Sequence, residues 1–183
     1  MSLGLKRNIV ELVEHDSEWE KLAFQTIQQL WRILGPVAKD IQHIGSTSIQ
    51  HIKAKPIIDI AVAIEDFLEI EALFDELESN GFSNRGWFLD EHMIFTIGEN
   101  VEPNDRITTH NIHIIKIDSA YWHDHIIFRD YLNAHPFVAK AYEALKIKLA
   151  SEYPYDIGRK KYAAGKNDFI NETLQKAAKW NQS

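Results

Sequence analysis

The stretch HIGSTSIQHIKAKPIIDIAVAI, residues 43–64, decides the fold. Its second half, from Ile57 to Ile64, is β-branched and almost entirely apolar, which is typical of a strand covered on both faces. Before it, the segment Gly45 to Ser48 predicts a turn or the start of a helix. Asp59 interrupts the strand, and burying its charge unpaired would cost energy. The protein must therefore compensate this carboxylate, through nearby donors, an open sheet end, or a metal or catalytic role.

The residues before this stretch predict a strand, a helix and another strand. A short strand is expected from Asn8 to Val13. Ser17 to Glu20 has the form of a capping box, and apolar residues then recur at helical spacing from Trp19 to Leu34, where Gly35-Pro36 ends the run. Val37 to Ile44 is short and suits a strand. The chain thus enters the Gly45 turn from a strand.

The residues after it predict one helix, three strands and a helical segment. Asp66 is expected to cap a helix that ends at Asn80-Gly81. Strands are expected over residues 82–88, 92–97 and 109–117, and helices from Tyr121 onward, with breaks at Pro136 and Pro154 that make three helices. This order predicts an α+β fold, a mixed β-sheet packed with helices plus a C-terminal helical segment. We expect a single domain over residues 1–183, with a core over about 1–118 and a tail over about 119–183.

Composition narrows the function classes. The chain has 183 residues, 45% of them hydrophobic and 26% charged, which predicts an ordinary globular domain. Twenty Lys and Arg against 27 Asp and Glu give a net charge of −7, so nucleic acid is not an expected partner and any phosphate site must be local. The chain has no cysteine, which excludes thiol nucleophiles and Cys-ligated metals. Since it shows no apolar run of signal-peptide or membrane-span length, we expect a soluble cytoplasmic protein.

The Gly-Ser turn and Asp59 together suggest nucleotide chemistry. A glycine followed by the hydroxyl residues Ser46, Thr47 and Ser48 offers N–H and O–H donors to phosphate, although such residues are also common in turns. Twelve residues separate Ser46 from Asp59, a spacing similar to the signature of polymerase β-like nucleotidyltransferases, in which Gly-Ser binds triphosphate and an Asp-x-Asp/Glu pair holds divalent metal. Positions 59 and 61 share one face of the strand, yet position 61 is Ala61. Half of the usual carboxylate pair is missing.

Histidines offer candidates for the rest of the site. His110 and His113 lie three apart on a predicted strand and therefore point to opposite faces. His113 is a candidate metal ligand or general base, with a hydrogen-bonded core histidine as the alternative, and Glu91 is a further candidate ligand. His43 stands where it could orient the Gly-Ser turn or touch phosphate. His123 and His125 lack the spacing of a helical metal pair and are expected at the surface or in packing.

Basic and aromatic side chains could hold a ligand. Lys53 and Lys55 flank the loop before the Asp59 strand, and Arg129 and Lys166 could reach the site from the helical tail. The alternatives are solvated lysines and, for Arg129, an ion pair with Asp130. The aromatic residues of the tail could stack on a nucleobase or belong to the core; they are Phe128, Tyr131, Tyr142 and Tyr153.

The amino-acid sequence of these segments resembles that of the GrpB family of bacterial proteins, and the resemblance extends over nearly the whole chain. The resemblance rests on residues 43–49 and 54–60, the Trp19 helix entry, and the segments 109–113, 128–136, 142–146 and 162–170. It implies a nucleotidyltransferase-like fold. The family's reaction is not established, and in some bacteria a similar domain is fused to a dephospho-CoA kinase. Gln50-His51-Ile52 departs from the family, where Pro-Gly-Leu is common.

The sequence leaves three functions open. The first is an enzyme of the nucleotidyl-transfer class that binds a nucleoside triphosphate or a nucleotide-containing cofactor with Mg²⁺ or Mn²⁺ at Asp59, completed by His113 or Glu91. In this scheme Gly45, Ser46, Thr47, Ser48, Lys55, Arg129 and Lys166 hold phosphate. The second is a non-catalytic binding module for a nucleotide, coenzyme A or a small anion. The third is an interaction protein with a degenerate site.

Overall fold

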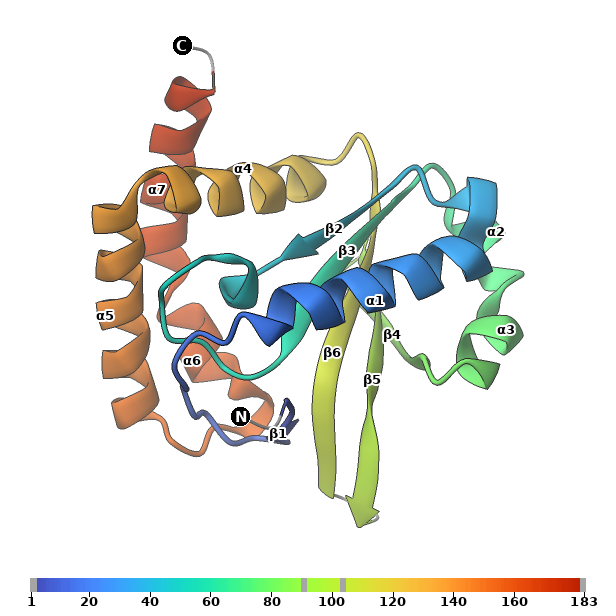
Figure 1. The fold of residues 1–183 in the computed structure, drawn as a ribbon, viewed down its shortest axis with the longest axis horizontal. Coiled ribbons are helices and arrows are strands. Elements are labelled where there is room, and N and C mark those ends of the chain that lie inside the picture. Colours follow the sequence, from blue (N-terminus) through green and yellow to red (C-terminus); the bar gives the residue numbers. More distant parts are fainter. Residues whose placement is uncertain (1–2, 90–91, 103–104, 182–183) are drawn as a thin grey trace.

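A computed structural model describes residues 3–89, 92–102 and 105–181 of the chain (Figure 1). The strands are β1 (Leu5–Lys6), β2 (Asp40–Ile44), β3 (Ile58–Ile64), β4 (Ser83–Leu89), β5 (His92–Glu102) and β6 (Asp105–Lys116). The helices are α1 (Glu18–Leu34), α2 (Phe67–Glu71), α3 (Phe74–Ser79), α4 (Ala120–Ala134), α5 (Pro136–Glu152), α6 (Lys160–Ala164) and α7 (Asn167–Trp180). The prediction of an α+β fold is confirmed.

The sheet is mixed and has the order β2-β3-β6-β5-β4, with β1 also pairing β6. Strands β3 and β6 run parallel, and the other pairs are antiparallel. In the parallel pair Asp59 lies opposite Asn111, and Ala61 lies opposite His113. This register places Asp59 near the start of β3, between β2 and β6, with a neighbour from a strand about fifty residues later in the chain.

Strand β3 is covered on both faces, as its apolar sequence predicts. On one face Ile58, Ile60, Val62 and Ile64 pack with α1, α2 and α3, through side chains that include Trp19 and Phe67. On the other face Ala61 and Ala63 pack with Trp122 of α4. Asp59 lies on this second face, where it lines a cavity and its side chain remains 28% exposed. The carboxylate therefore sits at an opening and not in the core.

The helical segment α4–α7 packs beside the sheet and holds the loop that precedes β3 (Figure 1). Apolar contacts join Ile49 and Ile52 of this loop to α4, α5 and α7. Polar contacts reinforce them: the Asn133 side chain bonds Ser48 O and Gln50 N, Lys140 donates to His51 O, Glu143 accepts from Lys53 N, and Lys146 donates to Lys53 O. We call residues 49–55 the clamped loop. Its backbone position is set by helices some ninety residues away.

Several local predictions need correction. The strand expected over Asn8–Val13 is wrong: β1 is Leu5–Lys6, and in that range Ile9 and Val13 make isolated bridges. The capping box at Ser17 is also wrong, because the Ser17 side chain makes no capping hydrogen bond and Asp16 Oδ1 accepts the Glu18 N–H instead. Asp66 caps α2 as predicted, but the helix breaks at Leu73, which leaves helical geometry.

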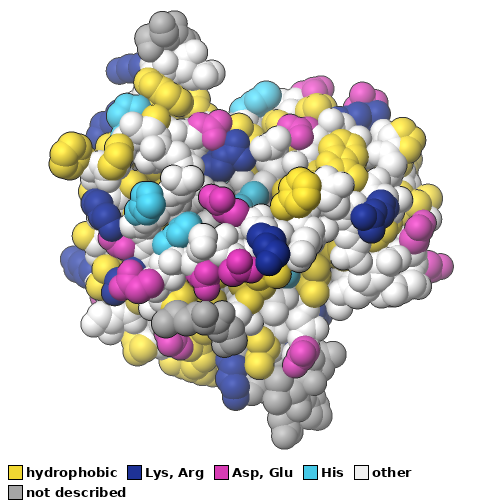
Figure 2. All heavy atoms as spheres, in the orientation of Figure 1, with side chains coloured by type: hydrophobic (Ala, Val, Ile, Leu, Met, Phe, Trp, Pro, Cys, Tyr) yellow, Lys and Arg dark blue, Asp and Glu magenta, His cyan; other side chains and the backbone are white. Residues whose placement is uncertain are grey.

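The strand ends and the tail also differ from the prediction. Strands β5 and β6 extend well beyond residues 92–97 and 109–117 into a long hairpin. The breaks at Pro136 and Pro154 are confirmed, but a further break at Gly165 separates α6 from α7. On the face in Figure 2, basic and acidic side chains are interspersed. No helix in the described part of the chain is long and apolar enough to cross a membrane.

Candidate functional site

Asp59 is the centre of a polar cluster on the face of the sheet that packs with α4. The register places Asn111 and His113 on the same face, and Asn111 Nδ2 donates to Asp59 Oδ1 at 2.8 Å. His113 Nε2 lies 3.6 Å from the same oxygen. Burial alone would raise the pKa of Asp59, but His113, Asn111 and the charge of Lys55 together lower the pKa to about 2. The carboxylate is therefore ionised at neutral pH.

The two histidines of β6 point to opposite faces, as predicted. His110 faces α1, where its Nε2 lies 3.3 Å from Thr26 Oγ1 inside the buried layer. His113 faces the Asp59 side. His110 is thus a hydrogen-bonded core histidine, whereas His113 belongs to the candidate site.

Two further histidines complete an imidazole group around His113. His92 of β5 is buried, and its Nε2 lies 2.8 Å from His113 Nδ1. His125 of α4 packs edge-on against Tyr121 with ring centroids 4.6 Å apart. Burial lowers the pKa of His92 to about 3 and that of His125 to about 4. Sequence reasoning singled out neither residue for this site, because only the strand register and the position of α4 bring them to it.

The Gly45 turn lies directly against Asp59. Gly45 has φ 72° and ψ −169°, a conformation that is essentially reserved for glycine. A Cβ at this position would lie 2.5 Å from Asp59 Oδ2. Glycine is therefore required both by the backbone and by the neighbouring carboxylate.

Only part of the hydroxyl run faces the cavity. Ser46 lines it, together with Gly45. Thr47 is buried with its Oγ1 2.9 Å from His43 Nε2, and Ser48 Oγ donates to the Gly45 carbonyl oxygen at 2.7 Å. The structure thus brings Gly45 to Asp59, leaves Ser46 in the cavity lining, and places the hydroxyls of Thr47 and Ser48 inside the turn.

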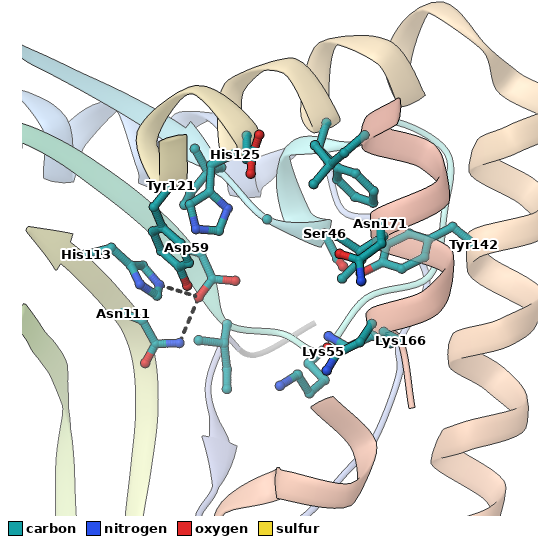
Figure 3. Close-up of a pocket in the computed structure, with 18 of the residues that line it drawn as sticks. Ser46, Lys55, Asp59, Asn111, His113, Tyr121, His125, Tyr142, Lys166 and Asn171 are labelled. Carbon is teal, nitrogen blue, oxygen red and sulfur yellow. Dashed lines mark hydrogen bonds and ion pairs between the residues drawn. The ribbon is translucent and has the colours of Figure 1, made fainter. Parts of the chain in front are cut away.

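A cavity of about 420 Å³ lies between the sheet and the helical tail (Figure 3). In this view Asp59, Asn111 and His113 lie on one side, and Lys55, Lys166 and Tyr142 lie on the other. The remaining polar and aromatic lining includes Tyr121, Asp124, His125, Phe128, Tyr162, Asn167 and Asn171. The cavity therefore has a carboxylate–imidazole end and a lysine end.

The lysine end is built on the Tyr162 ring. Lys55 Nζ lies 5.2 Å and Lys166 Nζ lies 4.9 Å from its centroid. Burial first, and then repulsion by Lys166 and Arg159, lower the pKa of Lys55 to about 7. Lys146, which the sequence did not single out, is buried behind Tyr142 with its Nζ 4.9 Å from that ring, and burial lowers its pKa to about 7 as well. Three lysines thus lie near one another: Lys146 is buried, and Lys55 and Lys166 are half-buried.

Arg129 does not line this cavity. Its Nη1 donates to Gln42 Oε1 at 2.9 Å and to the His43 carbonyl oxygen at 2.8 Å, and its Nε donates to Asp130. The guanidinium therefore ties α4 to strand β2 at the edge of the sheet.

We expect Arg129→Met to lower the free energy of unfolding by about 2 kcal/mol, because two charge-assisted hydrogen bonds to β2 are lost. The affinity for sulfate, used as an analogue of a phosphate group, is expected to stay unchanged, because Arg129 does not line the cavity. Urea unfolding and a sulfate titration check the two parts. A loss of affinity at unchanged stability would instead place Arg129 on the ligand, as the sequence suggested.

The described residues do not fit a site that holds divalent metal by paired carboxylates. Ala61, at the second carboxylate position, is fully buried under Trp122 of α4, so a charge there would be unsolvated. Outside residues 90–91 and the other undescribed positions, no three His, Asp or Glu side chains are placed to hold a metal ion. Glu91, the other candidate carboxylate, lies outside the described residues.

Comparison with known proteins gives a consistent family. The GrpB protein family matches residues 9–176. The glutamate-rich protein GrpB of Alkalihalophilus pseudofirmus is 38% identical over 94% of this chain and 98% of its own length. The crystal structure of conserved protein GrpB from Enterococcus faecalis superposes with a TM-score of 0.82 at 30% identity, covering 94% of this chain and all of that one.

The fold is also similar to that of a larger group of enzymes. The Cid1 poly(U) polymerase, a nucleotidyltransferase, superposes with a TM-score of 0.51 at 14% identity over 77% of this chain and 43% of that chain. At this identity the similarity concerns the fold alone. The sheet and its flanking helices are therefore nucleotidyltransferase-like, as the resemblance implied.

Proposed function

Because the chain belongs to the GrpB family and has a nucleotidyltransferase-like fold, we propose that it binds a nucleotide or a nucleotide-containing cofactor in the cavity beside Asp59. The phosphate group lies at the lysine end, between Lys55, Lys166 and Ser46. The rest of the ligand extends toward Asp59 and His113. The aromatic residues Phe128, Tyr142 and Tyr162 form the walls.

One observation carries this proposal. Lys55 and Lys166 line the cavity over a single tyrosine ring, and within the described chain neither ammonium has a carboxylate within ion-pair distance. Their mutual repulsion opposes burial of both charges. An anion between them would remove that repulsion, which makes phosphate binding favourable at this point. The Ser46 hydroxyl, at the start of the turn, adds a neutral donor.

Non-catalytic binding is the form of this function that Ala61 favours, since it needs no second carboxylate. Nucleotidyl transfer with Mg²⁺ or Mn²⁺ is the second candidate, and it is favoured by the fold and by the ionised Asp59. Because the described donors do not fit a paired-carboxylate metal site, we derive no reaction step through a metal. A thermal-shift panel of ATP, GTP, CTP, UTP and coenzyme A, with and without Mg²⁺, separates the two by metal dependence.

We expect Lys55→Met and Lys166→Met each to weaken sulfate binding by about tenfold or more, because each removes a charge-assisted contact. Sulfate keeps its charge from pH 6 to pH 9, so the wild-type affinity should fall as the pH rises through about 7, where Lys55 loses its proton. The Lys55→Met variant should lose most of this pH dependence. Isothermal titration calorimetry at several pH values measures the sulfate affinity of the wild type and of both variants.

Lys161→Met is the matched control. Lys161 also lies over a tyrosine, with its Nζ 5.7 Å from the Tyr153 ring, but it is exposed and outside the cavity. Its replacement should change sulfate affinity less than about twofold, as for a solvated surface charge. Equal affinities in wild type and in the Lys55→Met/Lys166→Met double variant would rule out the proposed phosphate position.

A further inference from the structure

The hydrogen bonds around Asp59 have a defined direction. His92 Nε2 and His113 Nδ1 share one hydrogen at 2.8 Å. If His92 donates it, the hydrogen of His113 is on Nε2 and faces Asp59 Oδ1. The reverse order would turn the lone pair of His113 Nε2 toward a carboxylate, which is unfavourable. His113 and Asn111 therefore both present N–H groups to the same carboxylate oxygen.

This arrangement suits a neutral donor better than a cation. Donor groups with partial positive charge surround Oδ1, and Lys55 also acts on Asp59 electrostatically. A metal ion or an ammonium at Asp59 would meet the repulsion of the Lys55 charge. A hydroxyl group would not, and it would form a charge-assisted hydrogen bond with the carboxylate.

The second carboxylate oxygen is the free one. Among residues 3–89, 92–102 and 105–181, no group hydrogen bonds to Asp59 Oδ2. This oxygen lies against Gly45, whose missing Cβ leaves space beside it. It also lines the cavity whose opposite side carries Lys55 and Lys166 (Figure 3). A ligand that fills the cavity thus meets cations at one end and an acceptor at the other.

From this juxtaposition we infer that the ligand is a hydroxylated phosphate ester, such as the sugar phosphate of a nucleotide, and that one of its hydroxyl groups donates to Asp59 Oδ2. Asp59 is then a specificity-determining acceptor and not a metal ligand. His113 and Asn111 are positioning residues that hold the carboxylate. The inference rests on the proposed function, because it places the phosphate at the lysine end.

The test compares two phosphate esters that share a five-membered ring containing one oxygen. Ribose 5-phosphate carries ring hydroxyls, and tetrahydrofurfuryl phosphate has the same ring and phosphate without them. Calorimetric titration with EDTA present should give ribose 5-phosphate an affinity at least about tenfold higher, the effect of one hydrogen bond to a charged group. In Asp59→Asn this preference should vanish, while the affinity for tetrahydrofurfuryl phosphate stays the same or rises.

Each other outcome overturns a distinct statement. Equal affinities of the two esters in wild type would overturn the inference but leave phosphate binding intact, and this comparison needs no variant. A preference that appears only with Mg²⁺ and is lost in Asp59→Asn would make Asp59 a metal ligand. No binding of either ester, and none of sulfate, would overturn the inference and the proposed function together.

Discussion

Lowering the pH from about 6.5 to about 4.5 is expected to unfold the protein cooperatively. In the folded protein, burial lowers the pKa values of four histidines well below that of a free imidazole. The values are about 3 for His92 and about 4 for His43, His110 and His125. In the unfolded chain each group binds a proton near pH 6.5. Below that pH the unfolded state therefore holds more protons than the folded state, and the free energy of unfolding falls as the pH is lowered.

The expected effect is large. Each such imidazole removes at most about 1.4 kcal/mol of unfolding free energy per pH unit, so four remove roughly 5 kcal/mol per unit. Typical domains have about 5–15 kcal/mol in total. Circular dichroism against pH gives the midpoint, and urea unfolding at several pH values gives the number of protons taken up. Asp59 adds to this loss only below about pH 4, between its unfolded and folded pKa values.

Single variants test the origin of this acid sensitivity. His110→Gln can keep hydrogen bonds to Thr26 and Thr109, and it should lower the proton uptake by about one. His123→Gln, on the exposed side of α4, is the control and should leave the uptake unchanged. If the unfolding free energy of the wild type were flat between pH 7 and pH 5, the buried imidazoles would not be neutral as described.

Gly45→Ala is expected to lower the free energy of unfolding by about 3 kcal/mol or more and to abolish ligand binding. The backbone of Gly45 is strained for any other residue, and the new methyl group would displace the Asp59 carboxylate. Urea unfolding measures the first effect and a sulfate titration measures the second.

Gly81→Ala is the matched control for backbone strain. Gly81 also has a positive φ, of 90°, but a Cβ there meets nothing within 4 Å. It should cost about 1–2 kcal/mol, from the left-handed backbone alone. The difference between the two variants therefore reports the contact with Asp59 together with the greater backbone strain at Gly45. If Gly45→Ala were no worse than Gly81→Ala and kept its ligand affinity, the turn would not be fitted to the carboxylate.

The fold was predictable where the residues of a single segment determine its secondary structure. The apolar run of β3, the period of α1 and the break at Pro136 each follow from neighbouring residues, and all three are confirmed. The strand expected at Asn8–Val13 failed because pairing depends on a partner strand, which local pattern does not supply. The long β5–β6 hairpin was underestimated for the same reason: its polar outer half is strand only because it is paired.

The site was predictable in part. Asp59 and Gly45 could be paired because their spacing resembles the nucleotidyltransferase signature, and the side-chain period alone placed His113 opposite to His110. The roles of His92, His125, Lys146 and Tyr162 could not be inferred, since they come from four separate elements that meet only in the folded chain. Thr47 shows the converse: its hydroxyl suits phosphate by type, but His43 engages it.

The clamped loop has a consequence for the order in which the chain acquires its structure. The cavity is lined by residues from Ile44 to Leu174, and the helices that fix the loop follow it by some ninety residues. Loop closure over such separations is slow, because chain entropy must be lost before the contacts repay it. During synthesis on the ribosome the chain can pair its sheet once it has been made as far as Lys116, the end of β6. The ligand has nothing to bind until the last helix has docked. A ligand therefore stabilises only the fully folded protein and not a partly synthesised chain.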